Sequence, residues 1–197
     1  MSNKVALTGN IGSGKSTIGH LFSLMGIPIY NADNEGKKFL FQASIKEAMV
    51  DIIGENILDK EHNIIFSEMA KIIFENDVLL SKVNAVIHPL VIADYFEWEK
   101  LQNTAPFTIF ESSIIFEHHL ESNFDFVVDV YCPDEIAINR AIQRGFQSEI
   151  DINNRLKRQL NTEIKKSKAD FVINNYNNFS VIEQISTILP LLCTEKV

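Results

Sequence analysis

The sequence predicts an α/β fold in which a five-stranded parallel sheet has helices on both faces. Apolar runs of about five residues alternate with stretches of helical periodicity, a pattern typical of strand–helix–strand units. The runs contain few polar residues, as expected for strands that are covered on both faces. The chain has 197 residues, 46% hydrophobic and 22% charged, so it can bury a sizeable core without disulfides or a structural metal.

Five segments carry the strand pattern, and a clear helix follows the first of them. The expected strands are Val5–Thr8, Ile27–Asn31, Phe107–Glu111, Phe126–Tyr131 and Phe171–Ile173. The helix is expected from Gly14 to Met25, because apolar residues recur there with the spacing of one helix face. Gly26 and Pro28 follow and end it.

A long helical segment interrupts this alternation. Roughly 75 residues separate the second and third expected strands, far more than one crossover helix needs. We therefore expect a single domain over residues 1–197 with a helical insertion over about 42–104. Such insertions often form a substrate wall, but this one could equally serve packing alone. Within it, His88 precedes Pro89 and is expected in extended backbone.

Composition excludes several classes of protein. The formal net charge of −8 argues against a dedicated nucleic-acid binder, whose surface should be basic. Cys132 and Cys193 are too few for a disulfide scaffold and lack metal-ligand spacing. No continuous apolar run approaches roughly 18 residues, so no membrane span is expected. We expect a cytoplasmic protein, a monomer or weak homo-oligomer, without nucleic-acid or membrane partners.

The charge is unevenly distributed along the chain. Residues 140–168 contain eight basic and three acidic side chains, although the chain as a whole is acidic. A cationic segment on an acidic body suits a protein that handles a small polyanion, because the local field matters more than net charge. A solvated basic helix face is the simpler alternative.

The strongest chemical signal is a phosphate-binding loop, Gly9-Asn10-Ile11-Gly12-Ser13-Gly14-Lys15-Ser16, which fits G-x-x-x-x-G-K-[ST]. It lies between the first strand and the first helix, where the glycines let backbone N–H groups approach phosphate oxygens. Lys15 should reach the β- and γ-phosphates, and the Ser16 hydroxyl is the expected Mg²⁺ ligand. The sequence therefore predicts a three-layer P-loop NTPase fold that binds a nucleoside triphosphate.

The loop alone does not distinguish a switch, a motor and a kinase. The stretch Lys166–Asp170 lacks the asparagine of a guanine-reading Asn-Lys-x-Asp motif, and no expected strand ends in Asp-Glu. Glu111, which ends the third strand, could bind Mg²⁺ through water or merely cap the strand. A short chain with a large insertion and a late basic segment favours a small-molecule kinase with an arginine-bearing lid over ATP.

Further motifs spread over residues 4–175 sharpen this hypothesis: Val5–Thr17, Leu24–Gly26, Tyr30–Asp33, His88–Pro89, Ser113–Glu117, Arg140 with Arg144, Arg158–Gln159, Lys165, and Ala169–Asn175. Together they resemble the dephospho-coenzyme A kinase family. The resemblance implies transfer of the ATP γ-phosphoryl group to the ribose 3′-hydroxyl of dephospho-coenzyme A, with a lid over about residues 138–168.

The resemblance also implies roles for individual residues. Asp33 would be the general base or positioning group for the hydroxyl, and Lys15 and Arg140 would stabilise charge on the transferring phosphoryl. The expected ATP contacts are Asn10, Ile11, Gly12, Ser13, Gly14, Lys15, Ser16, Thr17, Arg144 and Asn175. The expected substrate contacts are Thr8, Asp33, His88 and Glu117.

Three positions depart from the family pattern. Asn31 replaces the first aspartate of Asp-Ala-Asp, Ser113 replaces a proline, and Gly145 stands where an aspartate is common. Asn31 leaves Asp33 as the sole candidate base. Asn31 also keeps open a regulatory protein that binds ATP without catalysis. A nucleoside or nucleoside-monophosphate kinase is a second alternative, which only acceptor specificity would distinguish.

Overall fold

The computed structural model of the protein describes residues 2–143, 145 and 149–194. These residues form two compact units, one made of Met1–Asn31 with Glu99–Val197 and the other of Ala32–Trp98. The first unit contains the sheet, and the second is helical. Each unit has its own buried core.

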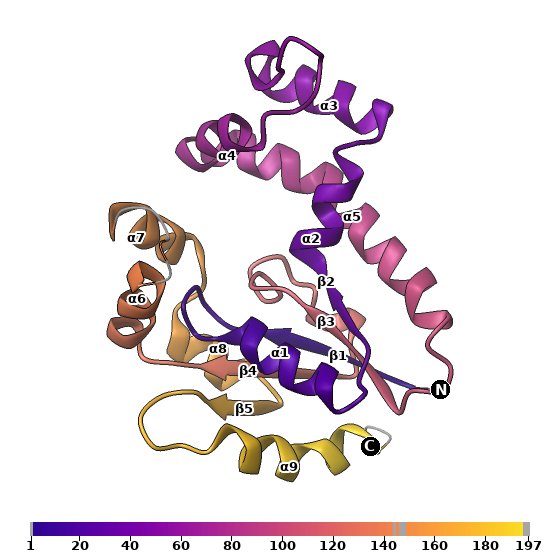
Figure 1. Ribbon diagram of the computed structural model, residues 1–197, viewed down its shortest axis with the longest axis vertical. Helices are drawn as coiled ribbons and strands as arrows, with labels where there is room; N and C mark the ends of the chain where they lie inside the picture. Colours follow the sequence, from indigo (N-terminus) through magenta and orange to yellow (C-terminus); the bar gives the residue numbers. More distant parts are fainter. Residues whose placement is uncertain (1, 144, 146–148, 195–197) are drawn as a thin grey trace. The chain divides into compact units, whose positions relative to one another are not determined.

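The five expected strands are present and form one parallel sheet. The strands are β1 (Asn3–Thr8), β2 (Ile29–Asn31), β3 (Phe107–Glu111), β4 (Phe126–Tyr131) and β5 (Phe171–Asn174). Their order across the sheet is β2-β3-β1-β4-β5, and all pairs are parallel (Figure 1). Every residue of β3 and β4 is buried, which explains why their sequences are almost unbroken apolar runs.

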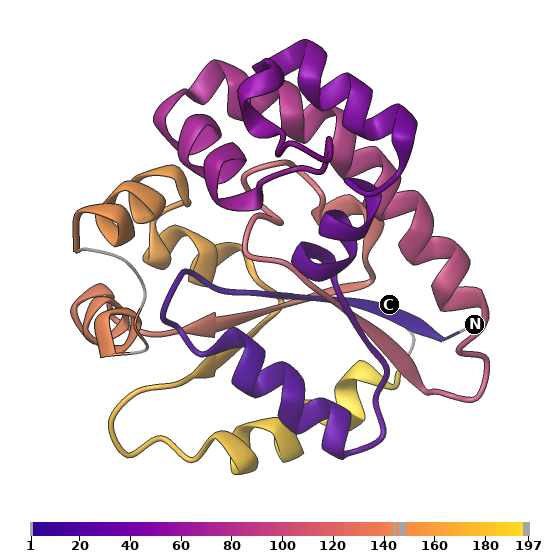
Figure 2. The same cartoon turned by 45° about the horizontal axis from the view of Figure 1, so that its top comes forward.

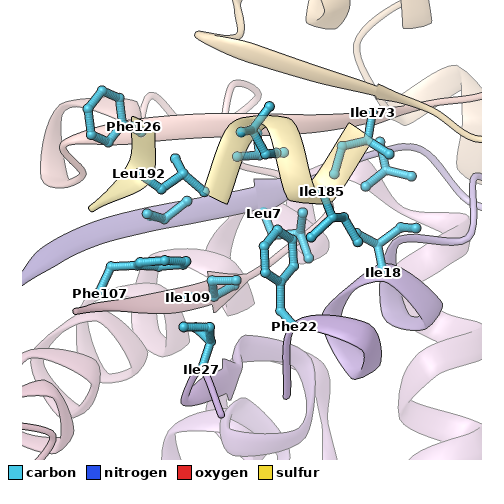
Figure 3. Packing of buried hydrophobic residues seen from close by; sticks show 14 residues of the cluster. Leu7, Ile18, Phe22, Ile27, Phe107, Ile109, Phe126, Ile173, Ile185 and Leu192 are labelled. Carbon is cyan, nitrogen blue, oxygen red and sulfur yellow. The ribbon is translucent and has the colours of Figure 1, made fainter. Parts of the chain in front are cut away.

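Helices cover both faces of this sheet, as the sequence predicts. The helices of this unit are α1 (Lys15–Leu24), α6 (Asp134–Gln143), α7 (Glu149–Arg158), α8 (Thr162–Lys168) and α9 (Val181–Leu192), with a short 3₁₀ turn, η2 (Glu121–Asn123). Ile18 and Phe22 of α1 pack with Ile185 and Leu192 of α9 against one face (Figure 3). Helix α8 contacts β4 from the opposite face (Figure 2).

The second unit is a small helical body around its own apolar cluster. It contains α2 (Ala32–Phe39), α3 (Ala43–Ile53), the 3₁₀ turn η1 (Glu55–Ile57), α4 (Phe66–Glu75) and most of α5 (Asp77–Lys100). The buried residues of this apolar cluster are Leu40, Met49, Ile57, Met69, Ile73 and Val83. The unit therefore begins at α2, directly after β2.

Helix α5 differs from expectation in two ways. It runs through His88 and Pro89 without ending, so the expected extended backbone at His88 is wrong. Val83 and Val91 are buried on either side of the proline, and this packing outweighs the local preference of the X-Pro pair. By length and composition α5 is also long and apolar enough to cross a bilayer, although a single helix of this kind is weak evidence for a membrane span.

The carboxyl edge of the sheet gathers polar side chains from three strands. Glu111 at the end of β3 pairs in register with Leu7 of β1 and with Asn31 of β2. Thr8, the last residue of β1, leads directly into the phosphate-binding loop. Ligands of open parallel sheets bind at this edge, so the strands bring the candidate residues together there.

Candidate active site

The phosphate-binding loop is closely packed from two sides. Gly12 has a φ of 77°, and a Cβ built there would lie 2.0 Å from the carbonyl oxygen of Ala137 in α6. Gly14 has a φ of 90°, and its Cβ would lie 2.2 Å from the side-chain nitrogen of Asn175. The left-handed backbone favours glycine at both positions, and at Gly12 the rigid Ala137 carbonyl excludes a side chain as well.

The N-terminus of α1 is open toward an anion. Its N-cap residue, Gly14, has no side chain to cap the helix, and the first turn contains no acidic residue. Ser16 and Thr17 are exposed in that turn. Uncapped N–H groups and the positive end of the helix dipole make this position a binding site for phosphate.

Glu111 holds the two reactive side chains of the loop. Its Oε1 lies 2.8 Å from Nζ of Lys15 and accepts a hydrogen bond of 2.7 Å from the Ser16 hydroxyl. Burial raises the pKa of Glu111, but the charge of Lys15 and hydrogen bonds from Lys15, Ser16 and Asn31 outweigh it and lower the pKa below its usual value. The carboxylate is therefore ionised at neutral pH, and the structure places it in the site.

The structure gives a physical reason for an asparagine, and not an aspartate, at position 31. Its amide hydrogen-bonds to Glu111, whereas an aspartate at this position would place a second negative charge against that carboxylate. The departure from the family pattern therefore removes a repulsion and leaves the surroundings of Lys15 intact.

Glu111 and Ser16 could hold a divalent cation together. Both supply oxygen atoms, and the hydrogen bond between them brings those atoms to one place. Mg²⁺ binds proteins through few oxygen ligands and keeps waters and substrate phosphates as the others. Among the described residues no three His, Cys, Asp or Glu side chains form a metal cluster, and such a magnesium site needs none.

Arg140 and Asn175, both implied by the family resemblance, are brought to the loop. Arg140 donates from Nη1 to the carbonyl oxygen of Asn175 at 2.8 Å. The Asn175 amide in turn donates to the carbonyl oxygen of Ser13 at 2.7 Å. The predicted lid residue Arg144 lies outside the described residues.

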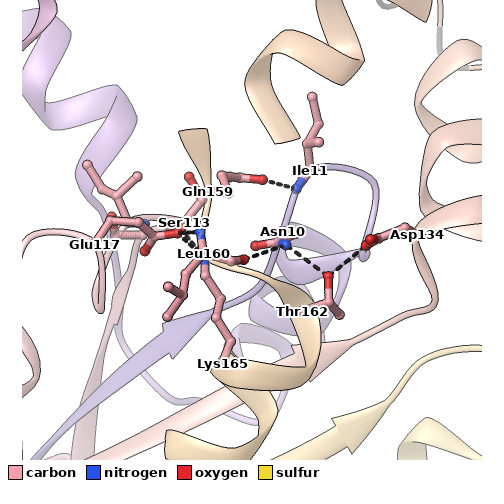
Figure 4. A network of polar contacts seen from close by, with 11 residues as sticks. Asn10, Ile11, Ser113, Glu117, Asp134, Gln159, Leu160, Thr162 and Lys165 are labelled. Carbon is pink, nitrogen blue, oxygen red and sulfur yellow. Dashed lines mark hydrogen bonds and ion pairs between the residues drawn. The ribbon is translucent and has the colours of Figure 1, made fainter. Parts of the chain in front are cut away.

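The other side of the loop is bound by the segment before α8 (Figure 4). The Asn10 amide donates to the carbonyl oxygen of Leu160 at 3.1 Å and to the Thr162 hydroxyl at 2.9 Å. The Ile11 N–H donates to the side-chain oxygen of Gln159 at 2.9 Å. Nothing in the sequence singled out Thr162, because the residues it joins are far apart in the chain.

Glu117, an expected substrate contact, has an internal partner. Its Oε1 lies 2.7 Å from Nζ of the fully buried Lys165 and accepts a hydrogen bond of 2.7 Å from the N–H of Leu160. Lys165 also donates to the carbonyl oxygen of Ser113 at 2.6 Å. The ion pair fixes the segment before α8, and the role of Glu117 toward the substrate stays a prediction.

Thr8 and Asp129 are buried side by side beneath the loop. They pair in register between β1 and β4, and neither Thr8 Oγ1 nor Asp129 Oδ2 has a hydrogen-bond partner among the described residues. Burial raises the pKa of Asp129 to about 7, against the opposing effect of the Lys165 charge. This carboxyl group is therefore largely protonated in the folded protein below neutral pH.

The remaining candidates, Asp33 and His88, belong to the helical unit. Asp33 is exposed in the first turn of α2, and His88 is half-buried in the middle of α5. Asp33 lies only two residues beyond Asn31, so whatever the placement of the unit its Cα stays within about 7 Å of the Cα of Asn31.

Asp129 makes stability depend on pH. The unfolded chain loses this proton near its usual pKa of 3.8, whereas the folded protein keeps it until about pH 7. The free energy of unfolding therefore falls as pH rises between those values. Because Asp129→Asn stays neutral, we expect it to exceed the wild type in stability at pH 8, by up to about 4 kcal/mol, and to lose that advantage toward pH 4.

Thermal and urea unfolding at pH 5 and pH 8 measure this difference. Asp51→Asn, at an exposed carboxylate of α3, is the matched control and should show no such trend. A constant loss of stability in Asp129→Asn at both pH values would show that the protein stabilises the charged form.

Substituting the loop glycine tests the packing against α6. Gly12→Ala adds both an unfavourable φ and a clash with the Ala137 carbonyl, so we expect at least about tenfold weaker ATP binding. Gly26→Ala is the matched control, because Gly26 also has a positive φ, 84°, but no atom within 4 Å of its Cβ position. It should cost about 1–2 kcal/mol of stability and leave ATP binding unchanged in a calorimetric titration. Equal ATP affinity in both variants would contradict the close packing.

Comparisons with known proteins agree with the fold described above. The family model described as dephospho-CoA kinase matches residues 3–180. A dephospho-CoA kinase from Bacteroides fragilis is 32% identical over 198 residues, covering 98% of this chain and 94% of the relative. The Aquifex aeolicus dephospho-CoA kinase is 36% identical over 176 residues, covering 87% and 88%. The crystal structure of TT1252 from Thermus thermophilus superposes with a TM-score of 0.84 at 24% identity, covering 98% of each chain, and shows the same fold.

Proposed function

The chain belongs to the dephospho-CoA kinase family, whose reaction is the last step of coenzyme A biosynthesis, and we propose that it transfers the γ-phosphoryl group of ATP to the ribose 3′-hydroxyl of dephospho-CoA. The acceptor oxygen forms a bond to the γ-phosphorus, the bond to the bridging oxygen breaks, and ADP leaves with coenzyme A as the other product. The observation that carries the proposal is the uncapped N-terminus of α1, whose first two residues are Lys15 and Ser16.

The nucleotide half of the site binds and neutralises the triphosphate. The uncapped N–H groups at the start of α1 and Lys15 contact the β- and γ-phosphates, and Arg140 stabilises the charge of the transferring group with its planar, two-pronged donor. Ser16 and Glu111 would hold Mg²⁺, which supplies further neutralisation of the phosphate oxygens. When ATP binds, the Lys15 ammonium group must therefore contact the phosphates as well as Glu111.

The acceptor half depends on Asp33. Its exposed carboxylate accepts the proton of the 3′-hydroxyl as the oxygen attacks, or holds that hydroxyl in line. Support comes from the short chain distance to Asn31, which keeps the Asp33 Cα within about 7 Å of the residue that hydrogen-bonds to Glu111. Thr8, His88 and Glu117 are the further residues that we propose on the acceptor side.

The cellular setting completes the proposal. We place the protein in the cytoplasm as a monomer or weak homo-oligomer, with small molecules as its partners and neither nucleic acid nor a membrane. The acidic net charge of −8 supports the absence of a nucleic-acid partner, whose binding surface would need to be basic.

Product identification tests the reaction. The purified protein is incubated with Mg²⁺, ATP and dephospho-CoA, and mass spectrometry should show the gain of one phosphoryl group at the ribose 3′-position. Parallel reactions with a nucleoside and a nucleoside monophosphate should give no comparable product. Phosphorylation of a nucleoside monophosphate but not of dephospho-CoA would overturn the proposal.

Replacing Asp33 tests the assignment of the base. Asp33→Asn keeps the size of the side chain but cannot take a proton, so we expect kcat to fall at least about 100-fold while the Kd for ATP changes little. Glu35→Gln is the matched control, since Glu35 shares the first turn of α2 and pairs with Lys38 on the surface. Normal turnover by Asp33→Asn would show that another group activates the hydroxyl.

A further inference from the structure

One hydroxyl group joins three distant parts of the sheet unit. Thr162 Oγ1 donates its single proton to Oδ1 of Asp134 at 2.6 Å and accepts a hydrogen bond from the Asn10 amide at 2.9 Å. The three residues belong to α8, to α6 and to the phosphate-binding loop (Figure 4). The Thr162 hydroxyl has one proton, which it donates to Asp134. The lone pairs of its oxygen then accept the hydrogen bond from Asn10, so both hydrogen bonds form at the same time.

The same helix, α6, reaches the loop at two further points. In its middle, the Ala137 carbonyl approaches Gly12 so closely that no side chain would fit. Near its end, Arg140 donates to the Asn175 carbonyl, and the Asn175 amide donates to the Ser13 carbonyl. The contacts form a closed ring from the loop through Thr162 and α6 back to the loop, and Arg140 is one of the residues in it.

The local structure of α8 does not need this hydroxyl. The N-cap of α8 is Asn161, whose side chain accepts hydrogen bonds from the N–H groups of Glu163 and Ile164. Capping, the usual reason for a threonine at a helix start, is therefore already supplied. The Thr162 hydroxyl instead makes contacts over sequence separations of 28 and 152 residues.

We propose that Thr162 is a positioning residue for phosphoryl transfer, whose hydroxyl holds α6 against the phosphate-binding loop so that Arg140 meets the transferring group. The inference rests on the proposed function, in which Arg140 stabilises charge on that group. Thr162 and Asn10 are both 8% exposed, and hydrogen bonds are stronger in such a low-dielectric environment. Small displacements of a charge-stabilising group slow a reaction strongly, so the loss of one hydroxyl should reach the reaction rate.

Two substitutions, one that removes the hydroxyl and one that keeps it, separate this role from simple packing. Thr162→Val replaces the hydroxyl with a methyl group, so Asn10 and Asp134 lose their common partner. We expect kcat to fall about 10- to 100-fold, with the Kd for ATP changed less than about threefold. Thr162→Ser restores the hydroxyl and should recover most of kcat. A normal kcat in Thr162→Val, or an equal loss in Thr162→Ser, would overturn the proposal.

A double-mutant cycle shows whether Thr162 acts through Arg140. In an Arg140→Ala background, Thr162→Val should cost little further kcat, because the group that it positions is already absent. If the two substitutions instead lowered kcat by factors that multiply in the double variant, Thr162 would act independently of Arg140, and this would contradict the proposal.

Asp134 supplies a second pair of variants in case Thr162→Val does not fold. Asp134 is exposed, so Asp134→Ala should fold and lower kcat, whereas Glu135→Ala removes a neighbouring exposed charge of α6 and should not. Equal rates in these two variants would overturn the proposal. The wild type is assayed first: no turnover of dephospho-CoA would refute the proposed function itself, whereas turnover with unaffected variants would refute only the role of Thr162.

Discussion

The left-handed backbone at Gly12 and Gly14 is the constraint on which the site depends. It turns the chain sharply between β1 and α1, so that the helix begins with uncapped N–H groups at the carboxyl edge of the sheet. The two glycines also leave room for the Ala137 carbonyl and the Asn175 amide to approach the loop. The loop is therefore shaped from outside as well as by its own sequence, and its neighbours carry the groups that the chemistry requires.

Buried charge is organised around this loop in two ion pairs. Glu111 holds Lys15 on the nucleotide side, and Glu117 holds Lys165 beneath the segment that binds Asn10 and Ile11. Removing one partner of a buried pair leaves an uncompensated charge and is strongly destabilising. The pairs therefore fix the site before nucleotide binds, and only the pair with Glu111 lies where a phosphate would compete for the lysine.

Much of the fold, but less of the site, could be predicted from the sequence. The five strands and α1 follow from local apolar periodicity, which burial on both faces makes unusually clear. The roles of Thr162 and Asp134 could not be predicted, because their contacts depend on how distant segments pack. At two positions of the basic segment the simpler interpretation, a solvated helix face, is wrong: Lys165 is buried in an ion pair, and Nζ of Lys166 lies 4.0 Å from the ring centre of Tyr131.

The account predicts that affinity for the nucleotide resides in its terminal phosphates. Calorimetric titration of the wild type and of Lys15→Ala with ATP, ADP and AMP measures this directly. ATP and ADP should bind the wild type far more tightly than AMP, and Lys15→Ala should lose most of that difference. Equal affinity for AMP and ATP, or an unchanged preference in Lys15→Ala, would contradict the central claim that the loop and its lysine bind the triphosphate.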